Sequence, residues 1–303
     1  MRVSSRSAPY VLLLPFLLLF AVFGLFPLLF SLYLAFQQWE PTSGLEAMQW
    51  VGLDNFAFAI FDAWFWKSLG NTLWLAVAGG VPQHLVAIPV ACLLHSSFGR
   101  LRNLMLGAWF VPYITSTVAV SIVFTLLYSP DYGLINSVLG AMRDWPLIGA
   151  LVPQDRIDWL GDPTYIPPAI AALVFWRFVG FNIVLYLAGL QAIPRDLYEA
   201  AQIDGATPLQ RFFHITLPGL RPMMVFGVTL SVVGGLQLFE EPFILTPDGR
   251  GGSDQAGLTA AVYVYRMAFD FNDFGAASAM AWMLFVAVAS LTWLTHRMFR
   301  SAR

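Results

Sequence analysis

Long apolar stretches alternate with short polar connections along most of the chain. A helix needs about 20 apolar residues to cross the hydrocarbon core of a bilayer, and six stretches reach that length. The sequence therefore predicts an all-α membrane protein with six transmembrane helices, at about Tyr10–Phe36, Leu69–Leu94, Leu104–Tyr128, Tyr165–Leu190, Met223–Leu245 and Ala276–Thr295.

The first apolar stretch follows Arg2 and Arg6, as the core of a signal peptide would. It is much longer than the roughly 7–15 residues of such a core, and no small-residue cleavage site follows it. We therefore expect it to remain in the protein as the first span.

The composition agrees with lipid as the main solvent. Of 303 residues, 58% are hydrophobic and 11% are charged, whereas a soluble domain has about 25% charged residues. So few charges could not cover a soluble fold of this size. The composition excludes an ordinary cytosolic enzyme, a disordered protein and a nucleic-acid binder, which needs a basic face.

The charged residues also predict the orientation in the membrane. Cytoplasmic connections carry an excess of Lys and Arg. One side of the predicted spans holds ten of the 16 basic residues, and the other side holds five of them with 13 of the 18 acidic residues. Both termini are therefore predicted to be cytoplasmic, on the side of Arg2, Arg6, Arg100, Arg102, Arg195, Arg211, Arg221, Arg297, Arg300 and Arg303.

Residues that could carry chemistry are few and scattered. The four histidines and the single cysteine, Cys92, show no metal-ligand spacing, so no metal site is expected. The single lysine, Lys67, does not lie in a Walker A loop, so the chain is not expected to hold ATP phosphates. Because no nucleophile is paired with a base, we expect no catalytic residues and no cofactor bound by this chain.

Residues 191–222, on the predicted cytoplasmic side, have the pattern of a helix, a turn and a second helix. Pro194 begins the first helix and Gly205 breaks it, while Thr207 has the spacing of a capping box at the start of the second. Pro218 is expected to end that second helix before the next span. A helical hairpin with small residues suits docking into a groove of another protein, and a plain surface loop is the alternative.

The hairpin, residues 191–222, closely resembles the EAA loop of binding-protein-dependent ABC permeases. The resemblance implies that the hairpin inserts between the lobes of a separate nucleotide-binding subunit and passes ATP-driven closure to the spans. ATP and Mg²⁺ would then be used by the partner ATPase. The residues expected to couple to it are Glu199, Ala200, Ala201, Asp204, Gly205, Ile215, Leu217 and Pro218.

The resemblance covers nearly the whole chain and is strongest to the carbohydrate branch, the permeases of maltose, oligosaccharide and glycerol-3-phosphate uptake. It implies the type I importer permease fold, with 1–66 as an N-terminal span and outer loop, 67–298 as the permease core and 299–303 as a cytoplasmic tail. The stretches that carry the resemblance outside the hairpin are Phe110–Tyr113, Ser129–Asn136, Leu187–Leu190, Gln237–Thr246 and Asp273–Ser278.

The resemblance also implies what the protein does and with what. The chain would form half of the path for a sugar in the bacterial cytoplasmic (inner) membrane. Its expected partners are ATPase subunits, a second permease subunit, an extracytoplasmic sugar-binding protein and membrane lipid, and no nucleic acid. One departure stands out: many relatives read LTGGGP where residues 245–252 read LTPDGRGG. That loop is expected to contact the binding protein or the outer gate.

Polar residues at membrane depth are candidates for the sugar path, because burying them is costly. Arg177 is the clearest, at about 18–20 Å from either end of its predicted span. Aromatic rings would contact a pyranose face, while polar groups bond its hydroxyls, and Arg also suits a phosphate or carboxylate. The candidates are Trp176, Arg177, Asn182, Gln237, Phe239, Glu240 and Glu241.

Structural roles remain open for the same residues. Arg177 could form an ion pair inside the bundle with Glu240, and Asn182 and Gln237 could make interhelical hydrogen bonds. Two other protein classes also remain open. A stand-alone secondary transporter would need a buried acid near the middle of a span, and a polytopic membrane enzyme would need a catalytic cluster.

Overall fold

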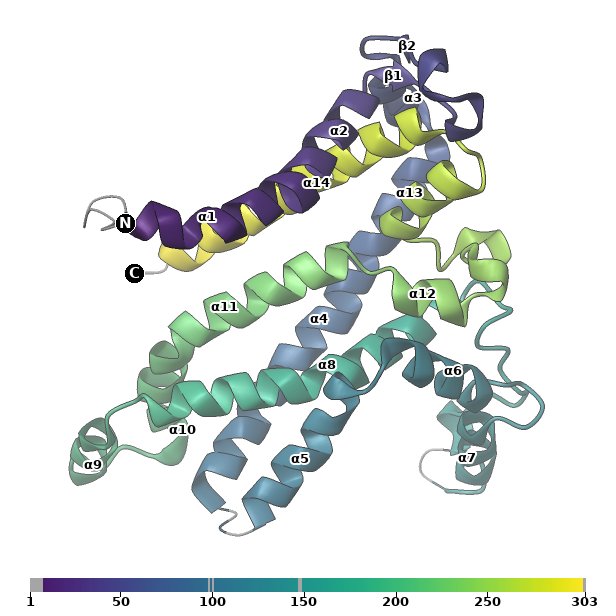
Figure 1. Ribbon diagram of the computed structural model, residues 1–303. Coiled ribbons are helices and arrows are strands. Elements are labelled where there is room, and N and C mark those ends of the chain that lie inside the picture. The colour runs from purple at the N-terminus through teal and green to yellow at the C-terminus, as the bar shows by residue number, and fades with distance from the viewer. Residues whose placement is uncertain (1–7, 98, 100, 147–148, 302–303) are drawn as a thin grey trace. The chain divides into compact units, whose positions relative to one another are not determined.

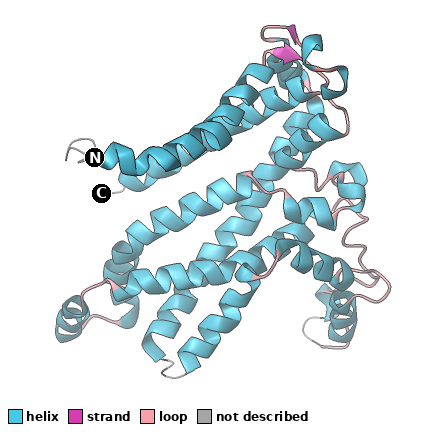
Figure 2. Ribbon diagram, viewed as in Figure 1, coloured by secondary structure: helices cyan, strands magenta, loops and turns pink. Residues whose placement is uncertain are grey.

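The computed structural model describes residues 8–97, 99, 101–146 and 149–301. Helices make up most of the described chain, with one short pair of strands (Figures 1 and 2). The chain divides into two compact units, residues 1–66 with 264–286, and residues 67–263 with 287–303. Four residues counted for the predicted orientation, Arg2, Arg6, Arg100 and Arg303, lie outside the described residues.

The first unit begins with one long helical run. It consists of α1 (Ala8–Phe20), a π turn (Ala21–Leu25) and α2 (Phe26–Leu34). Residues 12–34 are long and apolar enough to cross a membrane, as predicted. Large apolar side chains are exposed all round this run, for example Leu12, Phe16, Phe23 and Phe26. A helix that is apolar on every face suits a lipid environment.

A small ordered cap follows in the same unit. Strands β1 (Gln37–Gln38) and β2 (Gln49–Trp50) pair antiparallel, and α3 (Asp54–Phe61) comes next. The buried Asn55 side chain donates to the carbonyls of Ala35 and Gln37, at 3.1 and 2.8 Å. The start of α14 (Phe274–Ser301) approaches so closely that a Cβ on Gly275 would lie 2.1 Å from the Gln37 carbonyl.

The second unit is centred on α8 (Ile166–Gln191). This helix is the most buried of the membrane-length helices, and α5 (Leu101–Ile114) and α11 (Leu217–Leu236) both pack against it (Figure 1). Most of α4 (Ala63–Ser97) also belongs to this unit, whereas α13 (Ala260–Phe269) starts in it and continues into the first unit after Tyr263. The buried side chains of α8 include Ile170, Leu173, Ile183, Tyr186 and Leu190.

Glycines allow the close approach of α8 to its neighbours, as is usual for helices in membranes. A Cβ on Gly180 would lie 1.7 Å from the carbonyl oxygen of Trp109 on α5. A Cβ on Gly189 would lie 2.8 Å from the Met223 side chain on α11. The position of α8 therefore depends on the absence of side chains at these two sites.

One asparagine orders the connection between α6 (Thr117–Leu127) and α8. Helix α7 (Leu134–Met142) carries Asn136, whose amide donates to the Ile157 carbonyl at 2.9 Å. The amide oxygen of Asn136 accepts from the Ile157 N–H and from the Trp159 indole. A short helix and ordered turns therefore make up this connection.

The third predicted span is not a straight helix. Helix α5 ends at Ile114, α6 (Thr117–Leu127) begins two residues later, and the two are bent by 95°. Pro112 lies in the last turn of α5, and Ser116 is extended (φ −53°, ψ 127°). The prediction of one helix over 104–128 is therefore wrong. In the described residues five helices can each cross a membrane, and six spans result if this bent pair counts as one.

The bounds predicted for the fifth span are also wrong. A continuous helical run extends over Pro208–Leu236 and stops there, instead of covering Met223–Leu245. A separate short helix, α12 (Glu240–Leu245), follows a break. Pro242 explains the break, because its ring would clash with the Leu238 carbonyl if the helix continued. Glu240 and Glu241 therefore belong to the segment beyond the span.

We expect Gly180→Ala to lower the free energy of unfolding by about 3 kcal/mol, at the upper end of the usual cost of overpacking, because its methyl group would meet backbone. Unfolding by SDS titration of the detergent-solubilised protein, followed by circular dichroism, measures this. The matched control is Gly107→Ala on α5, whose Cβ would have no neighbour within 4 Å. It should change stability by less than about 0.5 kcal/mol. Equal effects of the two variants would contradict this account of the helix packing.

Candidate functional site

The hairpin begins with α9 (Arg195–Ile203) and turns at Gly205. The Gly205 N–H bonds the Gln202 carbonyl at 3.1 Å, and the Ala206 N–H bonds the Ala201 carbonyl at 2.8 Å. These two bonds form a Schellman motif, which needs a left-handed residue, and Gly205 supplies it with φ +75°. The turn predicted at Gly205 is thus confirmed and its geometry is explained.

The second helix of the hairpin starts with the predicted capping box. Thr207 accepts from the Gln210 N–H at 3.3 Å, and the Gln210 side chain accepts from the Thr207 N–H at 2.8 Å. Helix α10 (Pro208–Arg211) then passes through a π turn (Phe212–Thr216) into α11 without a stop. The prediction that Pro218 ends this helix is wrong, since the proline lies within the first two positions of α11, directly after the π turn.

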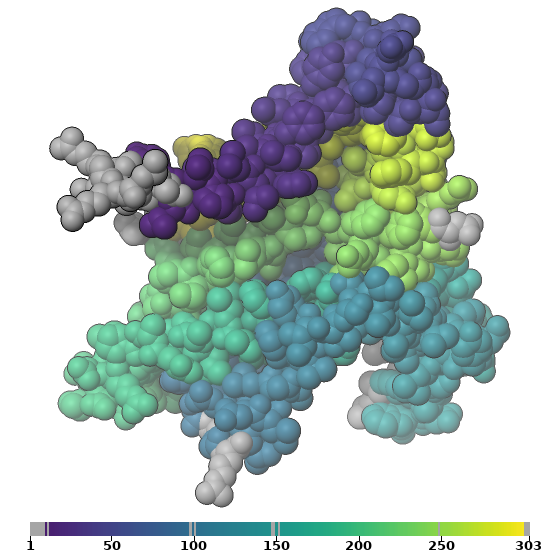
Figure 3. Space-filling model, in the orientation of Figure 1, coloured from purple at the N-terminus to yellow at the C-terminus, as the bar shows by residue number. Residues whose placement is uncertain are grey.

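The predicted coupling residues lie along this hairpin, largely on its surface. Glu199, Ala200, Asp204, Gly205 and Pro218 are exposed, and Ala201, Ile215 and Leu217 are half-buried. In the space-filling view the hairpin projects from its surroundings at one end of the α10–α11 run (Figure 3). The Tyr198 hydroxyl meets the Thr216 hydroxyl at 3.0 Å and holds α9 against the π turn.

Two large apolar side chains of the hairpin are exposed, although burial would be favourable for them. Ile203 is 88% exposed and Leu209 67%. A shallow pocket of about 340 Å³ lies beside them, lined by Ala201, Asp204 and Gly205 among others. Ile203 and Leu209 were not among the residues predicted to couple to a partner, although an apolar residue on each side of the helix-breaking Gly205 could have indicated a contact surface. This surface is suited to contact another protein.

A second feature is a cavity of about 220 Å³ enclosed by α4, α5, α8 and α11. Three aromatic rings line it, from Tyr113, Phe178 and Phe181. The Tyr113 and Phe181 rings are stacked with centroids 4.8 Å apart. The side chains of Gln83 and Asn182 add amide groups to the same wall. Aromatic faces beside amides are the surfaces expected to bind a sugar ring and its hydroxyls.

The two amides of the cavity are bonded to each other. Asn182 donates to the Gln83 side-chain oxygen at 3.1 Å, and Gln83 donates to the Val174 carbonyl at 3.4 Å. Both side chains are buried, with exposed fractions of 2% and 3%. The amide oxygen of Asn182 is buried and has no hydrogen-bond partner among the described residues, so a ligand hydroxyl that reached it would satisfy it.

Arg177 forms an ion pair, with Glu241 rather than with Glu240. Its guanidinium nitrogen lies 2.6 Å from the Glu241 carboxylate, and the two side chains are 14% and 4% exposed. The guanidinium carbon also lies 5.0 Å from the centre of the Phe178 ring, which lines the cavity. The ion pair therefore lies next to a residue of the cavity wall.

The remaining candidates for the sugar path are not part of the cavity wall. Trp176 is 41% exposed and packs on Phe124, with ring centroids 5.3 Å apart. Gln237 and Glu240 are exposed, and Phe239 stacks on Phe243. The structure thus places Asn182 in the cavity and Arg177 with Glu241 beside it, and leaves the other four outside. Tyr113 and Phe181 were not proposed for this role from the sequence.

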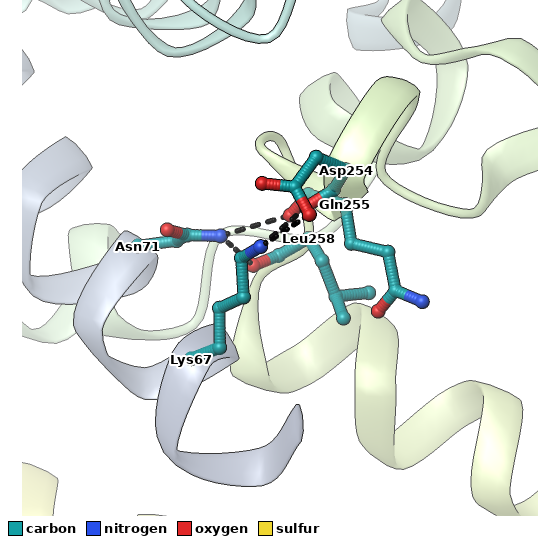
Figure 4. Close-up of polar contacts among 5 residues, drawn as sticks. All are labelled: Lys67, Asn71, Asp254, Gln255 and Leu258. Atoms are coloured by element: carbon teal, nitrogen blue, oxygen red, sulfur yellow. Dashed lines mark hydrogen bonds and ion pairs between the residues drawn. The ribbon is translucent and has the colours of Figure 1, made fainter. Parts of the chain in front are cut away.

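The loop after α12 is tied to α4 by polar contacts (Figure 4). Asn71 donates to the carbonyls of Gln255 and Leu258, both at 3.0 Å. Lys67 pairs with the Asp254 carboxylate at 2.9 Å and donates to the Asp254 carbonyl at 2.6 Å. Asp254 and Gln255 both have positive φ, 49° and 51°, a conformation that costs energy outside glycine. The contacts from α4 hold the loop in this strained shape.

The helices that are long and apolar enough to cross a bilayer define a multi-pass membrane protein. Residues 85–303 match the family described as "Binding-protein-dependent transport system inner membrane component", and the chain belongs to that family.

Transport system permeases are similar in sequence to this chain over nearly its full length. The chain is 33% identical to the arabinooligosaccharides transport system permease protein AraP of Bacillus subtilis, over 94% of this chain and 86% of the relative. It is 34% identical to the lactose transport system permease protein LacF of Rhizobium radiobacter, over 92% and 90%. A solved bacterial ABC transporter that imports the acidic polysaccharide alginate has the same fold, with a TM-score of 0.81, 24% identity and coverage of 98% and 96%.

Replacing Asn71 with Ala should loosen the loop more than replacing Lys67 with Gln. Asn71 makes two partly buried hydrogen bonds, worth about 1 kcal/mol each, so amide exchange at 255–258 should rise about tenfold or more. The Lys67 ion pair is 33% and 69% exposed, so its loss should raise exchange at most about fivefold. Hydrogen–deuterium exchange with mass spectrometry measures both. Asn103→Ala, at an exposed site on α5, is the control, and an equal or reversed order would refute the account.

Proposed function

We propose that this chain is one permease half of an ATP-binding-cassette importer for a sugar, and that its hairpin couples the spans to a separate ATPase. One observation carries the proposal: the hairpin, in a family of binding-protein-dependent transport components, leaves Ile203 and Leu209 uncovered on either side of Gly205. A soluble end of a membrane protein gains nothing by exposing such residues unless another protein covers them.

The geometry of the hairpin supports a docking role. The backbone bonds of the Schellman turn and the side-chain-to-backbone bonds of the capping box restrain the connection between α9 and α10. Ala200, Ala201 and Gly205 present little side chain, so a groove on the ATPase can approach the backbone. Glu199 is exposed on α9 and would pair with a basic residue of the ATPase. ATP and Mg²⁺ would act only in that partner, and this chain would carry no catalytic residue.

The cavity supports a sugar path. Its stacked Tyr113 and Phe181 rings and its buried Asn182 offer an apolar face and a free acceptor side by side. The named relatives transport arabinooligosaccharides and lactose, which are saccharides of two or more rings. We propose a di- or oligosaccharide, or a related polyol, as the cargo. Trp176, Gln237, Phe239 and Glu240 would contact it only if the path extends beyond the cavity.

The remaining parts of the proposal concern location and partners. The chain would lie in the bacterial cytoplasmic membrane with both termini in the cytoplasm, which puts the hairpin on the side of the ATPase. Residues 1–66 would supply an N-terminal span and outer loop, 67–298 the core and 299–303 the tail. A second permease subunit would complete the path, and an extracytoplasmic binding protein would deliver the sugar to the outer loops.

Gly205→Arg should leave the protein in the membrane while abolishing ATPase association and uptake. Arginine is strained at φ +75° and places a long cation in the pocket beside the turn. The measurement is ATP hydrolysis that copurifies with the tagged chain, with membrane insertion followed by fractionation.

Two controls separate the causes. Gly205→Asn keeps a small side chain that tolerates the left-handed conformation, so it should retain most of the copurifying ATPase. Gly140→Arg places the same side chain on α7, where a Cβ has no neighbour within 4 Å, and should retain all of it. Undiminished ATP hydrolysis with Gly205→Arg would disprove the coupling role of the hairpin.

A further inference from the structure

Membership of the family leaves the charge of the cargo open. One relative transports lactose, which is uncharged, and the protein of the same fold imports an acidic polysaccharide. The charge of the groups around the cavity therefore has to decide the question. This inference rests on the proposed sugar path through the cavity.

The wall of the cavity carries no formal charge. Among the described residues that line it, the polar ones are two amides, Gln83 and Asn182, with the hydroxyls of Tyr113 and Ser231. Every other lining side chain is apolar or is glycine. An anion that entered would lose its hydration without gaining a cation, whereas sugar hydroxyls can exchange water for these amides and hydroxyls.

The positive charge of Arg177, close to the cavity, is neutralised by an ion pair. Arg177 lies against the Phe178 ring, and Phe178 lines the cavity. An unpaired guanidinium at this place would attract anions to the cavity, because the buried surroundings screen its charge poorly. The Glu241 carboxylate lies 2.6 Å from it and is almost fully buried, so the two charges cancel at short range.

Glu241 is held in this place by the chain around it. It lies in the first turn of α12, directly before Pro242, and α12 packs against α6 and α8. The break between α11 and α12 turns Glu241 inward, while its neighbour Glu240 stays exposed. The same break contributes Leu238 to the cavity wall, three residues before Glu241.

We propose that the cavity accepts uncharged, hydroxyl-rich saccharides, and that Glu241 determines this specificity by neutralising Arg177. Glu241 excludes anionic sugars without touching the substrate. Without its charge, the unpaired Arg177 attracts carboxylate or sulfonate groups to the cavity. The Arg177–Glu241 pair thus keeps the surroundings of the cavity electrically neutral, and Asn182 forms a hydrogen bond with the sugar.

The test measures saccharide binding to the full-length chain with its copurified subunits in lipid nanodiscs, without the binding protein. Saturation-transfer-difference NMR titrations would use maltotriose as the neutral probe and trigalacturonate as the anionic probe of equal length. We expect the wild type to prefer maltotriose by at least about tenfold. Glu241→Gln should bring the anionic probe to equal or tighter binding, because an unscreened charge at this range is worth at least about tenfold.

Two variants distinguish charge from disruption. The double variant Arg177→Gln with Glu241→Gln removes both charges and should restore the preference for maltotriose. Glu240→Gln makes the same chemical change at the adjacent exposed site and should produce no gain in trigalacturonate binding. A gain in either variant as large as that of Glu241→Gln would overturn the assignment.

The results also separate this inference from the sugar path itself. If the wild type binds both probes equally, the path stands and the role of Glu241 is refuted. If Asn182→Leu binds maltotriose as well as the wild type does, the cavity is not the saccharide site, and both proposals for it fail. Loss of maltotriose binding in Asn182→Leu, together with the charge switch in Glu241→Gln, supports both.

Discussion

The structure depends on one constraint, that a backbone inside a bilayer must satisfy its own hydrogen bonds. Straight helices do so alone, but the chain breaks its helices next to the cavity, and side chains then take over. At the break after α11, the Thr259 hydroxyl donates to the Leu238 carbonyl at 2.7 Å. At the C-terminal end of α6, the Tyr128 hydroxyl donates to the Ala169 carbonyl on α8 at 2.8 Å. Side-chain hydrogen bonds thus allow irregular backbone beside the cavity.

The same constraint applies to charge. A buried ion pair rarely adds stability over an apolar pair, but removing one partner leaves a costly charge behind. Arg177 and Glu241 are therefore better understood as a device for placing charge than as a support for the fold. Their positions beside Phe178, and not in the cavity wall, let the protein hold two charges near a sugar path while leaving its surface neutral.

Hydropathy and local capping signals were sufficient for the first, second, fourth and sixth predicted spans and for the hairpin turn, since these depend on neighbouring residues. The Thr207 capping box and the left-handed Gly205 are examples.

Pro218 was wrongly predicted to end a helix, because the preceding π turn lets the helix continue and no local sequence signal indicates that turn. Glu240 was suggested as a possible partner of Arg177, whereas the partner is the adjacent Glu241, which follows a break in the helix. A break resets the helical phase, so which of two adjacent glutamates faces inward cannot be read from spacing. The 95° bend between α5 and α6 likewise depends on packing against α8 and α12, beyond the reach of Pro112 alone.

The uninterrupted run from Pro208 to Leu236 has a mechanical consequence. At 1.5 Å per residue its 29 residues form a rod about 44 Å long, with the hairpin turn at one end and glycines of the cavity wall at the other. No break interrupts this run, and its π turn (Phe212–Thr216) and Pro222 are the points at which such a helix can bend. If the run moves as one body, a tilt of about 5° at one end displaces the other by about 4 Å, the scale of a side chain. Pro218, which was expected to end the second helix of the hairpin, instead lies within this continuous run.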